Sequence, residues 1–529
     1  MEVTTRGGVE EVGRSCLEVS TETETILVDC GLKQAHETQY PDLTGLKPGD
    51  IDAAILTHAH IDHIGGLPLL EARDLFADDA PIFATRPTDA LGTIMLWDSY
   101  NLHKMQIQEN GGSQLYQQGD VEAVLDRIEG LPYGKHQWND YIIQFGNAGH
   151  LLGSAWVSLE HQQTRVLFSG DLGGRSAHLP DIEDPPAADA LFLESTYGDT
   201  HTHPSFRDAR TTLFEEATKA ATAGTPVLIP TFGMGRSQEL LQLFREREGT
   251  LPDNIEIVYD GLTEDSTNVY HAFASDPWVN ETILNYKINS GDTAPFLPNR
   301  AFKPETVEER QELVDGSQAP IIVAPSGMLT GGWSPFYLWK LVENYDDAKI
   351  LFTGFQAPGT VGRKLLDEPS GTATVTISAL MYPEQADADA TENFEEYERE
   401  DNDLFGFHPK TIDVPTDWVQ QITGLSGHAA ANTLLQFARQ ANAEQIHLNH
   451  GEPQTAAQLD SHLSGNVNAE TIRVAQYDET ISVEETGVVM TVKDELSSLK
   501  QQRNALQTRL DDFDDRIQAL ENKVTDIEK

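Results

Sequence analysis

Short apolar runs separated by turn-forming residues dominate about the first 195 positions. Strand-like runs occur at residues 26–29, 53–57, 141–145, 165–169 and 190–194. Runs of this length, bounded by turn residues, are typical of β-strands. Each of them ends at or beside a polar side chain, such as Asp29 or Glu194. This pattern predicts a layered α/β sandwich whose functional site lies at one edge of the sheets.

From about residue 199 to 423 the pattern changes to strands that alternate with helices. The strand-like run 226–230 leads to an amphipathic helix at 237–244, and similar runs at 320–324 and 349–353 are followed by glycine-containing turns. This alternation predicts a mostly parallel sheet in a separate α/β domain. Residues 384–403 carry ten acids and one Arg, which predicts a solvated insertion reaching to about residue 410. A functional acidic arm is the alternative.

The last segment, residues 493–529, has a different repeat. Its apolar positions alternate in steps of three and four, broken only by Arg503: Leu496, Leu499, Leu506, Leu510, Phe513, Ile517, Leu520, Val524 and Ile527. This spacing predicts a coiled-coil helix that forms a homodimer or binds a partner protein. A single helix lying on the protein's own surface is the alternative.

The charge balance is extreme. The 529 residues include 85 acids and 36 bases, giving a net charge of −49. The acids are spread along the whole chain, which favours adaptation to molar salt, where screening shortens repulsion to about 3 Å, over a patch for one basic partner. We therefore expect a halophilic, archaeal source. This charge does not exclude a nucleic acid as a partner, but any contact with one must be local, because salt weakens binding between phosphates and cations.

Cellular location follows from what the sequence lacks. Cys16 and Cys30 lie in apolar runs and are expected to be buried thiols. Residues 1–6 do not resemble a basic-then-apolar leader, and no run of about 18 apolar residues occurs. These features predict a soluble cytoplasmic protein without a membrane partner.

The motif His58-Ala-His60-Ile-Asp62-His63 carries the strongest chemical signal. It follows the strand-like run 51–57 and precedes two glycines. Three imidazoles and a carboxylate within six residues suit zinc. The alternative, three buried histidines that each find their own partner, is disfavoured because unpaired buried polar groups are costly. Ligand-type residues also end other runs: Asp29, His150, Asp171 and His450. We expect a hydrolytic metal site.

Together these ordered motifs resemble those of the metallo-β-lactamase superfamily. Glu194 in Leu-Glu-Ser-Thr-Tyr-Gly, His428 in Leu-Ser-Gly-His-Ala and His450 before Gly-Glu resemble the extra motifs of the β-CASP nucleases. Further matching motifs lie at residues 8–16, 230–240, 325–332 and 356–360. The resemblance covers about residues 6–490. It is closest to the archaeal and eukaryotic cleavage-and-polyadenylation-factor branch, here without the KH modules of some archaeal relatives.

The resemblance implies an αββα metallo-β-lactamase sandwich with an inserted β-CASP α/β domain. The expected segments are 1–198 and 424–492 for the sandwich, 199–423 for the insertion and 493–529 for the C-terminal coiled-coil helix. It also implies two zinc ions. One would be held by His58, His60 and His150, the other by Asp62, His63 and His450, with Asp171 bridging and Asp29 orienting ligand histidines.

The resemblance also assigns catalytic roles. Asp62 and His428 would act at the reacting phosphate, with His428 as the general acid and Glu194 holding its imidazole and raising its pKa. A structural ion pair is the alternative for Glu194 and His428. The family's nucleases often have Asp two residues after this histidine, where this chain has Ala430.

Glycine-containing turns are candidates for substrate binding. Backbone amides near Gly233 and Gly235 could hold an RNA phosphate with Arg236 as its charge partner. Ordinary turn chemistry is the alternative. Similar candidates are Ser326, Gly327, Ser426 and Gly427. We do not expect His201, His203 or His447 to bind metal.

We therefore expect a zinc-dependent ribonuclease that acts on single-stranded RNA in processing or decay. It would cut internally, from the 5′ end, or both, leaving 5′-phosphate and 3′-hydroxyl ends. Two alternatives stay open. One is a catalytically silent scaffold subunit of an RNA-processing complex, and the other is a small-molecule metallohydrolase on the same fold.

Overall fold

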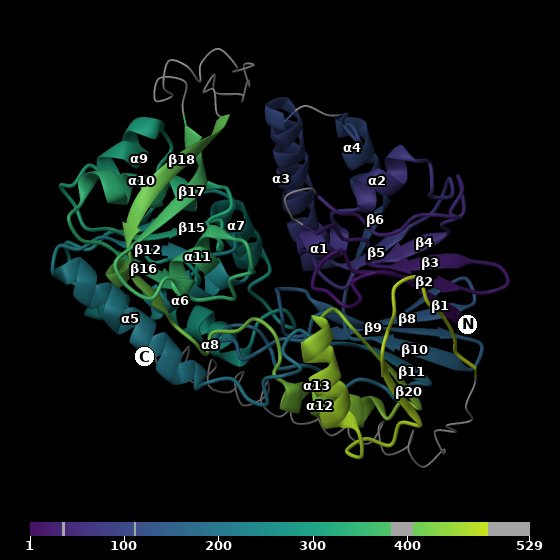
Figure 1. Ribbon diagram of the computed structural model, residues 1–529. Coiled ribbons are helices and arrows are strands. Elements are labelled where there is room, and N and C mark those ends of the chain that lie inside the picture. Colours follow the sequence, from purple (N-terminus) through teal and green to yellow (C-terminus); the bar gives the residue numbers. More distant parts are fainter. Residues whose placement is uncertain (34–37, 111–112, 382–405, 485–529) are drawn as a thin grey trace, which may run out of the picture. The chain divides into compact units, whose positions relative to one another are not determined.

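A computed structural model describes residues 1–33, 38–110, 113–381 and 406–484 (Figure 1). The described chain contains two seven-stranded sheets, a six-stranded sheet and a two-stranded hairpin. The tail at 493–529 and most of the predicted acidic insertion lie outside these residues, so neither expectation is tested.

The two seven-stranded sheets are both of mixed direction. In spatial order, the first sheet consists of β22 (Thr480–Ser482), β1 (Glu2–Gly7), β2 (Cys16–Ser20), β3 (Thr25–Val28), β4 (Ala53–Ile55), β5 (Ile82–Thr85) and β6 (Ile128–Leu131). The second consists of β21 (Thr471–Val474), β20 (Gln445–Asn449), β11 (Ala190–Glu194), β10 (Thr164–Phe168), β9 (Ala155–His161), β8 (Tyr141–Asn147) and β7 (Gly134–Trp138).

These sheets pack face to face through alternate apolar residues. Val19 and Ile26 of the first sheet share one buried cluster with Phe145, Phe168 and Phe192 of the second. Helices cover the outer face of each sheet, because that face is apolar as well. The first is covered by α1 (Ile61–Ile64), α2 (Leu67–Ala72), α3 (Arg86–Asn110) and α4 (Gln118–Arg127), the second by α12 (Ala431–Ala441) and α13 (Pro453–Leu463). The result is an αββα sandwich.

The six-stranded sheet is parallel throughout. Its order is β14 (Ala301–Phe302), β13 (Ile257–Tyr259), β15 (Ile321–Ala324), β12 (Val227–Pro230), β16 (Lys349–Phe352) and β19 (Val419–Gln421). The three central strands β13, β15 and β12 are buried on both faces, as expected for a parallel sheet. Val227 and Ile229 pack with α5 (Phe206–Thr222) and α6 (Arg236–Glu246), while Leu228 packs with α10 (Trp333–Asn344) and the hairpin of β17 (Thr372–Met381) and β18 (Gly406–Pro415).

Short helices complete this part of the chain. They are η1 (Glu248–Thr250), α7 (Thr263–Ala272), α8 (Glu281–Ser290), α9 (Val307–Leu313), α11 (Val361–Asp367) and η4 (Thr416–Trp418). The helix expected at 237–244 is α6, which begins one residue earlier and ends two later. One expectation needs correction: residues 406–410, assigned to the acidic insertion, lie in β18, where ten residue pairs join the hairpin strands.

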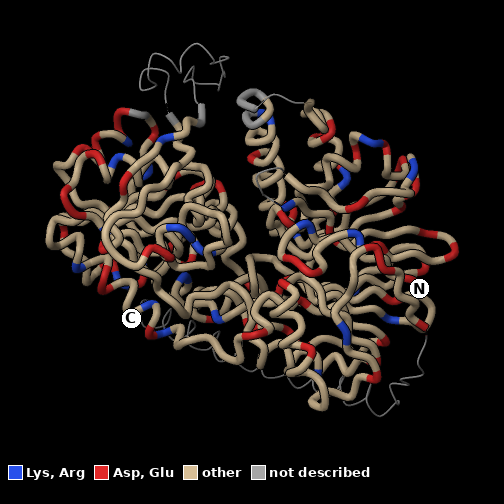
Figure 2. The backbone as a smooth tube through the Cα atoms, viewed as in Figure 1, with Lys and Arg blue, Asp and Glu red and all other residues tan. Residues whose placement is uncertain are grey.

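Acidic residues are distributed over all parts of the described chain, and basic residues are sparse among them (Figure 2). Cys16 and Cys30 are buried free thiols. Within the described ranges, no helix combines the length and apolar character needed to cross a membrane.

The distributed charge predicts that stability rises with salt. The melting temperature should be higher in molar KCl than in about 0.1 M KCl, because the screening length falls from about 10 Å to about 3 Å. Circular dichroism melts at several KCl concentrations measure this. An equal or lower melting temperature in molar KCl would contradict adaptation to salt.

Candidate metal centre

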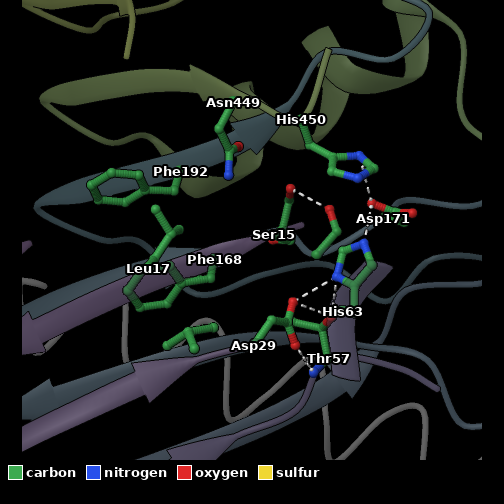
Figure 3. A pocket seen from close by; sticks show the side chains of 13 residues that line it. Ser15, Leu17, Asp29, Thr57, His63, Phe168, Asp171, Phe192, Asn449 and His450 are labelled. Carbon is green, nitrogen blue, oxygen red and sulfur yellow. Dashed lines mark hydrogen bonds and ion pairs between the residues drawn. The ribbon is translucent and has the colours of Figure 1, made fainter. Parts of the chain in front are cut away.

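Asp171 lies at the centre of the predicted site and faces two groups of side chains. It follows β10 after the turn at Ser169 and Gly170. Gly170 has φ +52°, and a Cβ there would meet Thr57 at 2.8 Å. Asp171 is 2% exposed. Its Oδ2 lies 3.6 Å from His58 Nε2 and 3.7 Å from His150 Nε2. Its Oδ1 lies 3.4 Å from His63 Nε2 and 3.2 Å from His450 Nδ1 (Figure 3).

The first group consists of His58, His60 and His150. His60 Nδ1 lies 3.1 Å from both His58 Nε2 and His150 Nε2, so three ring nitrogens converge on one point. Burial lowers the pKa of all three imidazoles, to about 4 for His60. They are therefore neutral near pH 7, as metal ligands must be. Converging lone pairs of this kind suit a cation.

The second group consists of Asp62, His63 and His450. His450 Nε2 lies 3.4 Å from Asp62 Oδ2. Burial would lower the pKa of His63 and His450, but neighbouring carboxylates outweigh it and raise both. Among the described residues, His63 Nε2 and Asp171 Oδ1 are buried without a hydrogen-bond partner. Since such atoms are costly to bury, their position facing one another fits a bound cation.

Close packing of the backbone brings these ligands together. α1 begins directly after His60, so Asp62 and His63 lie on its single turn. This turn packs against the end of β3, where Cys30 N donates to the carbonyl of His63 at 2.8 Å. A Cβ at Gly31 would come within 1.6 Å of the Asp62 carbonyl oxygen. A glycine is therefore required there for the turn to approach the strand.

Hydrogen bonds from behind orient two of the histidines. Asp29 Oδ2 accepts from His63 Nδ1 at 2.7 Å and from Thr57 Oγ1 at 2.8 Å (Figure 3). The carbonyl of Gly427 accepts from His150 Nδ1 at 2.8 Å. Both rings thus direct Nδ1 to an acceptor behind them and Nε2 towards Asp171, which is the orientation that metal-binding histidines usually have.

His428 and Glu194 form a third group of side chains, which lies beside Asp171. His428 Nδ1 lies 3.4 Å from Glu194 Oε2 and 3.8 Å from Asp171 Oδ2. Glu194 is fully buried, and its Oε1 accepts from Leu172 N at 2.7 Å. Burial alone would lower the pKa of His428, but the charges of Glu194 and Asp171 outweigh it and raise the pKa to about 9. The imidazole is thereby kept protonated and can donate.

The loop that carries His428 is attached to the segment after Asp171. Ala429 N donates to the Leu172 carbonyl at 2.7 Å, and Gly174 N donates to that of Gly427 at 2.9 Å. A Cβ at Gly174 would lie 2.4 Å from the Ser426 carbonyl oxygen. The two loops therefore approach closely enough to bring His428 to the same carboxylate as the metal-type histidines.

The oxygen and nitrogen donors form three groups, and within each group they lie within 4.8 Å of one another: His58, His60, His150 and Asp171; Asp62, His63 and His450; Asp171, Glu194 and His428. Every residue assigned to metal binding or catalysis from the sequence is in this cluster. The three excluded histidines contact other groups. His447 stacks on Phe192, and His201 packs on His462.

His203 supports the site in a way that the sequence did not reveal. Its Nε2 donates to the His428 carbonyl at 3.0 Å. The residue is 225 positions away from His428 in the chain. The sequence could not predict this contact, because its acceptor is a backbone oxygen, which every residue carries.

The candidate substrate turns are partly occupied by internal bonds. Gly235 N donates to Gln238 Oε1 at 2.7 Å, and Arg236 N donates to the Met234 carbonyl. These two amides are therefore not available as the phosphate cradle that the sequence suggested. Ser326 Oγ accepts from Thr330 N at 2.9 Å, and Ser426 Oγ accepts from His428 N at 3.1 Å.

The side chain of Arg236 is available instead. Its Nη2 lies 3.7 Å from where a Cβ on Gly427 would be, and His150 Cε1 lies 3.5 Å from the same point. Burial lowers the pKa of Arg236, but the guanidinium stays charged near neutral pH. The charge of Glu239 acts in the opposite direction and raises this pKa. A cation therefore lies beside the first group of histidines.

The family models that match this chain agree with this geometry. Three family models match: a metallo-beta-lactamase superfamily domain at residues 17–178, a Beta-Casp domain at 237–365 and a Zn-dependent metallo-hydrolase RNA specificity domain at 411–474. A solved protein of unknown function from Enterococcus faecalis V583 has a TM-score of 0.48 at 10% identity, over 91% of this chain and 99% of its own.

Two curated relatives come from Methanocaldococcus jannaschii. One, named transcription termination factor FttA, is 31% identical over 84% of this chain. The chain spans 66% of that relative's length. The other, named RNase J-like protein, is 34% identical over 68% of this chain and 79% of its own length. The chain belongs to the β-CASP ribonuclease family of the metallo-β-lactamase superfamily.

Proposed function

We propose that this chain is a zinc-dependent ribonuclease that hydrolyses phosphodiester bonds of single-stranded RNA, internally or from the 5′ end. The observation that carries the proposal is the position of Asp171 between two groups of imidazoles, with the His428–Glu194 pair on a third side. Nitrogen and carboxylate donors without a thiolate suit zinc. The membership in a family with RNA-acting relatives supports RNA as the substrate.

The proposed ligand sets follow the geometry. His58, His60 and His150 would hold one zinc ion, Asp62, His63 and His450 the other, and Asp171 would contribute to both sites. When bound, two zinc ions supply Lewis-acid activation of water and charge neutralisation at the phosphate. Asp29 and the Gly427 carbonyl keep His63 and His150 in the required tautomer.

The reaction ends with a proton transfer by His428. The attacking water releases one proton to the solvent, from which His428 later regains one. The water oxygen forms a bond to phosphorus, and the bond from phosphorus to the ribose 3′ oxygen breaks. His428 donates its proton to that departing oxygen, leaving 5′-phosphate and 3′-hydroxyl ends. Glu194 keeps the imidazole oriented and charged before the transfer. Asp62, whose carboxylate lies beside His450, is proposed to act at the same phosphate.

Substrate contacts are proposed at the turns that surround this centre. The Arg236 guanidinium is the proposed charge partner for an RNA phosphate. Gly233 and Gly235 shape the turn before it. Ser326, Gly327, Ser426 and Gly427 are proposed to line the path of the RNA backbone on neighbouring loops.

We also propose a domain organisation and a cellular setting from the resemblance to this family. Segments 1–198 and 424–492 would form the metallo-β-lactamase domain, 199–423 the β-CASP domain and 493–529 a coiled coil that joins two chains or a partner. The protein is proposed to work in the cytoplasm of a halophilic archaeon. The relative named a transcription termination factor suggests nascent transcripts as one setting for cleavage.

Metal content tests the ligand assignment. The purified chain should carry two zinc ions, and His63→Ala or Asp171→Ala should lose one or both, because each removes a converging donor. Mass spectrometry of bound metals measures this, with circular dichroism to verify folding. His201→Ala, outside the cluster, should keep the wild-type content. Wild-type protein that binds no zinc would favour a silent scaffold.

Activity tests the substrate class. A 5′-labelled single-stranded RNA in molar KCl should be cleaved by the wild type and spared when a chelator removes the metal. His63→Ala and Asp171→Ala should leave the RNA intact. Gel analysis of the product ends measures this. Full cleavage by either variant would refute the metal assignment, and intact RNA with the zinc-loaded wild type would point to a small-molecule substrate.

Kinetics of His428→Ala test the proton transfer. Losing a general acid should lower kcat on the order of a hundredfold. Bound zinc should stay at the wild-type level, because His428 is not a proposed ligand. Steady-state cleavage rates and metal analysis on the same sample measure both. Loss of zinc would make His428 a ligand, and an unchanged kcat would leave only a structural ion pair with Glu194.

A further inference from the structure

Two phenylalanines are exposed on loops that follow neighbouring strands of the parallel sheet. Phe232 is 47% exposed and Phe355 is 50% exposed. Phe232 follows β12, and Phe355 follows β16, its neighbour in the parallel sheet. Because parallel strands end at the same edge, both aromatic side chains leave the sheet on that edge. Single exposed aromatics are common on protein surfaces, but a pair on adjacent loops is informative.

The turn at Ser326 and Gly327 fixes both loops. A Cβ on Gly327 would lie 3.2 Å from Phe232 N. On the other side, Gln356 Nε2 donates to the Gly327 carbonyl at 2.9 Å. Thr231 N donates to the Ala324 carbonyl at 3.0 Å, which joins β12 to the same turn. The two phenylalanines are therefore held on rigid loops on either side of one glycine.

This edge of the sheet faces the catalytic cluster. Phe232 is four residues before Arg236, whose guanidinium lies near Gly427 and His150. A Cβ on Gly235 would lie 3.0 Å from Leu151 Cδ1, next to His150 in the chain. A phosphate held at the metal centre would thus have its neighbouring nucleotides within reach of the loops that carry Phe232 and Phe355.

We propose that Phe232 and Phe355 form a stacking platform for bases of single-stranded RNA next to the scissile phosphate. The proposal rests on the ribonuclease function proposed above. Unpaired bases present flat faces that stack on aromatic rings irrespective of base identity. Stacking releases no counterions, so it persists at salt concentrations that weaken phosphate contacts. A chain with 85 acids and 36 bases needs such a salt-tolerant contact with a polyanion.

The test measures RNA affinity without cleavage. Zinc-loaded His428→Ala protein is titrated with a fluorescent single-stranded RNA at several KCl concentrations. Adding Phe232→Leu or Phe355→Leu, which keep an apolar side chain but remove the flat ring, should weaken binding roughly tenfold each. The slope of log affinity against log salt should not change. Tryptophan at either position should restore affinity.

Two controls separate stacking from other causes. Phe302→Leu removes another exposed aromatic, on the far edge strand β14, and should leave affinity unchanged. Arg236→Gln should reduce the salt slope, because it removes a phosphate contact. Parental affinity in both leucine variants, with wild-type protein that cleaves RNA, would overturn the platform alone. A wild type that neither binds nor cleaves RNA would overturn the ribonuclease proposal as well.

Discussion

The site depends on the burial of one carboxylate, Asp171, among imidazoles that lie on both of its oxygens. A buried negative charge is stable only when opposite charge compensates it. In this protein the compensation comes from two directions, and His63 Nε2 and Asp171 Oδ1 still have no hydrogen-bond partner among the described residues. The cluster therefore buries polar atoms that lack hydrogen-bond partners, and a bound cation would satisfy them.

The fold brings these side chains together because three strands end next to one another. β10 leads to Asp171, β4 leads to His58, and β20 leads to His450. Glycines at tight approaches let the backbones come close enough, as at Gly31 beside Asp62 and at Gly174 beside Ser426. The apolar layers between the sheets hold these strand ends at fixed positions, so the ligand geometry follows from packing of the sandwich rather than from the loops alone.

Much of this was readable from the sequence. The dense motif from His58 to His63 and the ligand-type residues at strand ends identified the cluster, because their residue types and positions repeat a pattern. The sequence could not reveal contacts made through backbone oxygens, such as those of His150 with Gly427 and of His203 with His428. It also offered the amide of Gly235 to a phosphate, whereas the structure shows that Gln238 accepts from this amide. The 25-residue helix α3 was missed because its apolar positions form no single stripe.

We propose that the histidines and aspartates of this cluster bind a pair of divalent cations. A crystal structure of zinc-loaded protein, with anomalous scattering recorded at the zinc edge, would reveal the positions of the ions. We expect two anomalous peaks about 3.5–4 Å apart, on either side of the Asp171 carboxylate. Peaks absent from this cluster, or a single peak held by other residues, would contradict it.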